Sequence, residues 1–277
     1  WLTEIGGDKT GGGWFDPYGT HEDTYLEQAR QTILADVKEM VLFCYGSLQT
    51  ETGPANVEAL RAELPALFEL ARLVQGKPIK GIAAPKSPNS DAKDESYVYD
   101  YVGMMGLPLV PTARIDTEAK AAFLPVQALK APLLYGKLAA LLDAGAPVLI
   151  TEGLAEELTT FVTEDENLSV LLIDGRPNNL LKLTRDELKP IRDNLLAPFG
   201  IQFDAPNKVA LYLIGDDVVI IENFNDEAVT ASLEFAKPIQ ARKALVLPKQ
   251  GSVEFSTTAG RIELKTITPR TLVALIY

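Results

Sequence analysis

A single glutamate near the start of the chain has surroundings typical of a reactive carboxylate. Glu4 lies in the segment Trp1-Leu2-Thr3-Glu4-Ile5-Gly6-Gly7, where we expect residues 1–5 to form a strand that ends close to it. The glycines that follow have no side chains, so the backbone there can approach a ligand closely. A carboxylate in this position can act as a nucleophile, or it can be a solvated or capping group. The residues alone leave both alternatives open.

A glycine-rich segment with three aromatic residues comes next, and it reads Gly11-Gly12-Gly13-Trp14-Phe15-Asp16-Pro17-Tyr18-Gly19. We expect a loop here. Its aromatic side chains can pack against the neighbouring structure, which is the favoured interpretation, or they can face a ligand.

The chain has one histidine and one cysteine, which limits the chemistry it can perform. His21 alone excludes sites with several histidine ligands, and we expect it to be exposed before a helix that Thr20 or Asp23 caps. Cys44 lies in an apolar run where a thiol acts as a small hydrophobic group, and a lone cysteine excludes an intrachain disulfide. The compartment cannot be read from it.

Other polar patterns favour structural roles. Glu152, in Thr151-Glu152-Gly153, resembles the Glu4 segment but precedes an expected helix, where an acidic residue suits the helix dipole. The acidic residues of the loop 91–95 lack the spacing of a calcium site. The sequence has neither GxGxxG nor a phosphate-binding loop, so we expect no cofactor and no metal.

The periodicity of apolar residues predicts three domains. In residues 1–76, a strand at the start, a helix over 24–36, a buried strand over 40–45 and a helix that Pro65 kinks or splits indicate parallel strands with helical crossovers. Residues 77–206 alternate again and predict a flavodoxin-like parallel α/β domain, whose helix over 184–196 starts with a capping box.

From residue 207 the pattern consists of short β-branched runs separated by turn residues, with Gly215-Asp216-Asp217 as a tight hairpin link. This predicts an antiparallel β-sandwich over 207–277. The predicted fold class is therefore α/β followed by all-β.

The Thr3-Glu4 segment, the aromatic loop after it and the helix, strand and helix that follow resemble the end of a retaining glycoside hydrolase built on a (β/α)8 barrel. The nucleophile of those enzymes is a glutamate at the end of the seventh strand, often after Thr or Ser. A barrel followed by a flavodoxin-like or amidotransferase-like domain and a small β-sandwich is similar to the layout of the family 42-like β-galactosidases. About 75 residues precede the second domain here, whereas a barrel needs about 200 to 250.

This resemblance implies that Glu4 is the nucleophile of a double displacement on a β-linked sugar. It also implies that Trp14, Phe15 and Tyr18 form a platform for a sugar face, with Asp16 or His21 at its edge. The mechanism needs a second carboxylate about 5 Å from the first. The family carries that acid/base glutamate at the end of the fourth strand, so we expect it outside this chain and expect residues 1–277 alone to be inactive.

The same resemblance allows another interpretation, in which the second domain and the sandwich form a non-catalytic accessory or oligomerisation module. The amidotransferase-like segment 77–200 contains neither cysteine nor histidine, so we expect no catalysis there. The sandwich contains few aromatic residues, and most of them fit core positions. A carbohydrate-binding role for the sandwich is therefore the least favoured of the three interpretations.

Composition narrows the set of partners. The net charge is −12, from 38 acidic and 26 basic residues, and no basic patch interrupts it, so we expect no nucleic-acid partner. The apolar runs are too short for a membrane-spanning helix. The opening at Trp1, without Met or a leader, is typical of a fragment or a processed product. The expected partners are a carbohydrate substrate, the missing N-terminal part of the barrel and a second copy in a homo-oligomer.

Overall fold

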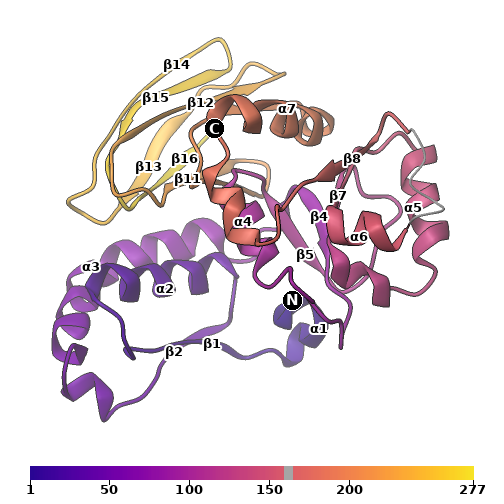
Figure 1. Ribbon diagram of the computed structural model, residues 1–277. Coiled ribbons are helices and arrows are strands. Elements are labelled where there is room, and N and C mark those ends of the chain that lie inside the picture. Colours follow the sequence, from indigo (N-terminus) through magenta and orange to yellow (C-terminus); the bar gives the residue numbers. More distant parts are fainter. Residues whose placement is uncertain (159–164) are drawn as a thin grey trace.

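The computed structural model describes residues 1–158 and 165–277 (Figure 1). Within these residues, the strands form a parallel pair near the N-terminus, a parallel sheet and two antiparallel sheets. The predicted combination of α/β and antiparallel β structure is confirmed.

The N-terminal elements are, in chain order, α1 (Leu2–Gly6), β1 (Gly12–Phe15), α2 (Glu22–Leu34), β2 (Glu39–Leu42) and α3 (Gly53–Val74). The expected strand over residues 1–5 is wrong, because the amide of Ile5 donates to the carbonyl of Trp1 at 2.8 Å and closes a helical turn. The Trp1 side chain holds this turn in place, since its ring contacts Tyr99 at 4.6 Å and its Nε1 donates to the Ala84 carbonyl at 3.3 Å.

Two further expectations for this region need correction. The strand predicted over 40–45 as buried is β2, which ends at Leu42 and is mostly exposed, because within the described residues it pairs only with β1. Pro65 does not split the second helix, and α3 continues through it. Pro65 is exposed, so water can bond to the carbonyl that the missing N–H leaves free.

The parallel sheet has the order β5-β4-β6-β7-β8, which is the flavodoxin-like order. Its strands are β4 (Ile82–Pro85), β5 (Leu109–Thr112), β6 (Ala122–Leu124), β7 (Val148–Thr151) and β8 (Leu168–Leu171), and the helices beside it are α4 (Val98–Met104), α5 (Leu134–Asp143) and α6 (Glu152–Glu157). Helices α5 and α6 pack on one face, and α4 belongs to the cluster on the other.

The segment 79–84, at the start of the predicted flavodoxin-like domain, is divided between two sheets. Residues Ile79–Lys80 form β3, which pairs with an antiparallel strand, and β4 begins only at Ile82. Gly81 between them has a φ of 142°, and a Cβ there would lie 2.0 Å from the Pro108 carbonyl oxygen. Only glycine fits this bend.

The antiparallel strands are ordered β13-β16-β11-β10-β3 in one sheet and β14-β15-β12-β9 in the other. Their bounds, with the helix before them, are α7 (Arg185–Leu196), β9 (Ile201–Asp204), β10 (Val209–Ile214), β11 (Val218–Asn223), β12 (Val229–Phe235), β13 (Arg242–Leu247), β14 (Val253–Thr258), β15 (Arg261–Ile267) and β16 (Thr271–Ile276). The Gly215–Asp217 hairpin joins β10 to β11, with Ile214 opposite Val218. The capping box of α7 is present, between Thr184 and Glu187.

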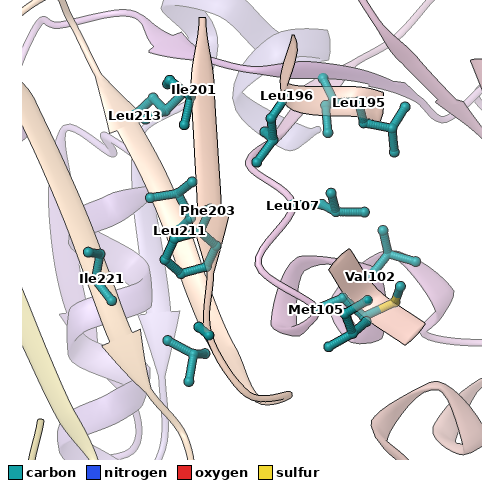
Figure 2. Packing of buried hydrophobic residues seen from close by; sticks show 14 of the residues in the cluster. Val102, Met105, Leu107, Leu195, Leu196, Ile201, Phe203, Leu211, Leu213 and Ile221 are labelled. Atoms are coloured by element: carbon teal, nitrogen blue, oxygen red, sulfur yellow. The ribbon is translucent and has the colours of Figure 1, made fainter. Parts of the chain in front are cut away.

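Strand β11 shows how this sheet joins the parts of the molecule. Its side chains alternate between two cores, with Val218 and Ile220 facing α2 and α3, and Val219 and Ile221 facing the second antiparallel sheet. Both faces are covered, so the run of consecutive β-branched residues is buried throughout. Figure 2 shows part of the second core, in which Phe203 and Leu211 from β9 and β10 lie close together.

Candidate functional site

The parallel pair β1–β2 brings two loops together at the carboxyl ends of its strands. Phe15 lies opposite Leu42 in the register, so the residues that follow each strand leave the pair at the same edge. The close packing of β1 on α2 depends on Gly13, where a Cβ would lie 2.5 Å from Cγ2 of Thr32. The expected glycine-rich loop therefore begins as a strand, and its glycines serve packing.

An exposed aromatic cluster forms at this edge, from Trp14, Tyr18 and Phe43. The rings of Trp14 and Phe43 stack with centroids 5.3 Å apart and planes 12° from parallel, and Tyr18 meets Phe43 edge-on at 6.1 Å. Trp14 remains 69% exposed and Tyr18 58% exposed. A flat, accessible aromatic surface of this kind can pack against the apolar face of a ring-shaped ligand.

Hydrogen bonds to α2 and α3 fix the loop that carries Tyr18. The Gln28 side chain accepts from the Asp16 amide at 3.1 Å and donates to the Asp16 carbonyl at 3.2 Å, which ties the loop to α2. The Asp16 carboxylate accepts from the Tyr18 amide at 3.0 Å. Asn56 of α3 donates to the Thr20 hydroxyl at 3.2 Å. The aromatic surface is thus held by both helices.

Two residues expected at this platform lie elsewhere. Phe15 points away from Trp14, as successive strand residues must, and is buried against Tyr25 at 4.9 Å. His21 is exposed at the N-cap of α2 without a side-chain capping bond, so the cap expected from Thr20 or Asp23 is not formed.

Phe43 is the member of the cluster that the sequence interpretation missed. It was assigned to a buried strand because of its apolar neighbours. A strand at β1 would have pointed to Phe43, because the parallel pairing of β1 with β2 brings the residue after Leu42 close to Trp14. Cys44 comes next and is half-buried, and a hydrogen bond from the Tyr18 hydroxyl lowers the pKa of its thiol.

Glu4 is exposed and belongs to the helix α1, so it does not end a strand as expected. It lines a cavity of about 870 Å³, together with Ser87, Arg114 and Lys137. The loops that form this cavity follow β4 and β5, where ligands of open parallel sheets generally bind. The described residues that line it include none of the aromatic cluster. The structure therefore holds Glu4 and the cluster in separate places.

Two acidic residues beside the parallel sheet have structural surroundings. Glu152 begins α6, whose N-cap hydroxyl of Thr151 accepts from the Leu154 amide. Glu95 is buried, and its carboxylate accepts from the Thr151 hydroxyl and the Val126 amide, each at 2.9 Å. Among the described residues, no group of His, Cys, Asp and Glu has the arrangement of a metal site, and no helix has the length and hydrophobicity needed to cross a membrane.

Comparison with known proteins finds a family model that matches the N-terminal third. Residues 1–91 match the model of the GH_cat family, described as a probable glycosyl hydrolase, catalytic domain. The chain resembles the C-terminal part of a barrel glycoside hydrolase. No curated protein matches the sequence.

Two solved glycoside hydrolases share the fold. α-L-Fucosidase isoenzyme 2 from Paenibacillus thiaminolyticus superposes with a TM-score of 0.56 at 10% identity, over 95% of this chain and 60% of its own. The GH42 β-galactosidase Gan42B superposes with a TM-score of 0.50 at 10% identity, over 93% of this chain and 51% of its own. The chain thus spans about half to three fifths of each neighbour. At this identity the likeness establishes the fold, with its barrel-type end, parallel domain and β-sandwich.

Proposed function

We propose that this chain is the C-terminal portion of a glycoside hydrolase that cleaves a β-linked sugar by a retaining double displacement. In this proposal Glu4 attacks the anomeric carbon, and an acid/base carboxylate outside residues 1–277 protonates the leaving group and then activates water. The observation that carries the proposal is the match of residues 1–91 to a glycosyl hydrolase catalytic domain, because Glu4 lies inside the matched segment.

The surroundings of Glu4 and of the aromatic cluster support this assignment. Glu4 is exposed, lines a large open cavity and is free of salt bridges to other described residues, as a carboxylate that must reach a substrate needs to be. Trp14, Tyr18 and Phe43 provide a stacking surface for a sugar ring, with Asp16 at its base. A productive complex in which both act on one substrate requires α1 to move toward the cluster when the rest of the barrel is present.

The test uses the full-length protein that carries these residues and an aryl β-D-galactoside. Glu4→Gln should lower kcat by about 10³-fold or more, whereas the control Glu152→Gln, which also follows a threonine, should leave it unchanged. Azide should restore turnover to Glu4→Gly and give a glycosyl azide of inverted configuration, because it replaces the missing nucleophile. Full activity of Glu4→Gln, or inversion by the wild-type enzyme, contradicts the proposal.

A second candidate function is assembly, and exposed apolar residues around the parallel sheet favour it. Leu133, before α5, is 81% exposed, and Leu172, after β8, is 70% exposed. Contiguous exposed apolar residues mark subunit contacts, and we propose that Leu133 and Leu172 belong to such a surface. The accessory or oligomerisation module should therefore run as an oligomer in size-exclusion chromatography with light scattering. Leu172→Lys should shift it toward the monomer, and an unshifted or monomeric wild-type profile contradicts the assignment.

A further inference from the structure

A second cavity, of about 370 Å³, lies where the N-terminal helices meet the sandwich loops. One wall comes from α2 and α3, and the other from Phe224, Pro248 and Arg270, which belong to three loops between the antiparallel strands. Neither Glu4 nor the aromatic cluster contributes to it. Its volume falls within the range of small-molecule sites.

Arg30 of α2 lines this cavity and is only 2% exposed. Its Nη1 donates to the Glu27 carboxylate and to the Arg270 carbonyl, each at 3.3 Å. Its Nε has no hydrogen-bond partner among the described residues. A buried guanidinium donor left unpaired costs free energy, which a ligand acceptor would recover.

Glu63 of α3 faces the same cavity and is 3% exposed. Its Oε2 accepts from the Lys249 amide at 3.3 Å, and its Oε1 has no partner in the part of the chain that the structure describes. The helical wall of the cavity therefore holds one donor on α2 and one acceptor on α3 that have no partner among the described residues. Both atoms belong to charged groups, and a buried charged group without a hydrogen-bond partner is unfavourable in free energy.

The rest of the lining decides which ligand these groups suit. Four carboxylates and two guanidiniums line the cavity, so its net charge disfavours anions: Glu22, Asp23, Glu27 and Glu63 against Arg30 and Arg270. Apolar walls from Leu26, Ala59 and Phe224 suit a ligand with an apolar face. A hydroxyl both donates and accepts, so neighbouring hydroxyls on one ring can bond to Glu63 and to Arg30.

We propose that this cavity binds a neutral sugar of monosaccharide size, with hydroxyls on Arg30 and Glu63 and its C–H face on the apolar wall. Because its two walls come from the N-terminal helices and the sandwich loops, a bound sugar bridges the two parts. Binding should then raise the unfolding temperature, since the ligand binds only the folded state.

The test measures binding of D-galactose by ligand-observed NMR and by thermal shift, in a Trp14→Ala background that removes stacking at the aromatic cluster. Ala59→Leu, which fills the wall, should weaken binding by about tenfold or more, equivalent to about 1.4 kcal/mol. Ala55→Leu, on the same helix but outside the lining, should bind as well as the background protein. Glu63→Gln should also weaken binding, because it exchanges the free carboxylate for an amide.

The proposal is overturned if galactose does not bind, if Ala59→Leu and Ala55→Leu bind it equally, or if inorganic phosphate or leucine binds in its place. Circular dichroism of each variant verifies that it is folded. The experiment measures binding and not hydrolysis, so its result does not depend on whether Glu4 is the nucleophile. A Glu4→Gln protein that has lost activity should still bind galactose here.

Discussion

Strands β2 and β11 are both rich in apolar residues, but β2 is mostly exposed and β11 is buried. Every residue of β11 is buried, because helices cover one face of its sheet and a second sheet covers the other. In β2, Val41 and Leu42 are exposed, and within the described residues this strand pairs only with β1, so its other edge is open. Apolar residues next to an uncovered face indicate a surface that another molecule or segment covers. The difference places the more stable packing in the sandwich and leaves an open apolar edge in the N-terminal region.

The largest effect should come from the sandwich side of this comparison. Phe203 of β9 is fully buried beside Leu211 (Figure 2). The Arg192 guanidinium lies over its ring, 5.2 Å from the centroid. Phe203→Ala should lower the free energy of unfolding by about 3 to 5 kcal/mol, because it leaves a cavity. Phe43→Ala, at the open edge, should cost less than about 1 kcal/mol. Urea unfolding measures both, and equal losses would remove the contrast between the regions.

A buried acid at the boundary between the regions should make stability depend on pH. Glu222 of β11 accepts from Gln31 of α2 at 3.0 Å, and burial, reinforced by the nearby Glu27 carboxylate, raises the pKa of Glu222. A raised pKa in the folded state means that its contribution to stability is complete below the unfolded pKa, about 4.3, and is lost as the pH rises toward the folded pKa. Each pKa unit is worth about 1.4 kcal/mol.

Glu222→Gln keeps the neutral form at every pH. Its free energy of unfolding, relative to that of the wild type, should therefore rise from pH 5 to pH 8. Urea unfolding at the two values measures it. Glu22→Gln, at an exposed position of α2, should show a difference that changes little with pH. If the difference in unfolding free energy between wild type and Glu222→Gln were the same at both pH values, ionisation of Glu222 would not destabilise the fold.

Helix starts give a smaller contrast between the two regions. Helix α7 begins with a complete capping box, in which Thr184 and Glu187 bond reciprocally, whereas α2 begins at His21 without a side-chain bond. Thr184→Ala should therefore cost about 1 kcal/mol, and His21→Ala should cost almost nothing. Thermal unfolding of the two variants checks this, and a loss at His21 equal to that at Thr184 would mean that His21 supports α2 in another way.

The sequence predicted most where local rules decide the structure. The capping box, the Gly215–Asp217 hairpin and the alternation of the parallel sheet follow from spacing and turn chemistry, and all are present. It failed where distant contacts decide. The helix at residues 1–5 depends on Trp1 packing against Tyr99, almost one hundred residues away. Gly81 lets the segment 79–84 bend from one sheet into the other at a place where a side chain would collide with the Pro108 carbonyl.

The candidate site shows the same limit. Trp14 and Tyr18 could be proposed from their residue types, but Phe43 depends on the pairing of β1 with β2, which the glycine-rich sequence hides. Arg30 and Glu63 read as ordinary charged residues of amphipathic helices. Their burial comes from the sandwich loops, which lie more than 180 residues later in the chain.

The smallest effect on stability should accompany a clear effect on recognition. Trp14→Ala removes an exposed ring whose main contact is the stacked Phe43, so unfolding should change by no more than about 0.5 kcal/mol. Affinity for a β-linked galacto-oligosaccharide should fall by about tenfold, because one stacking surface is lost. Phe68→Ala is the matched control, since Phe68 is exposed on α3 outside the cluster and should affect neither quantity. Titration in the Ala59→Leu background, which closes the second cavity, isolates the cluster. Unchanged affinity would show that the exposed rings are there to meet another part of the protein, and a stability loss as large as that of the buried Phe15→Ala would show that Trp14 is part of the core.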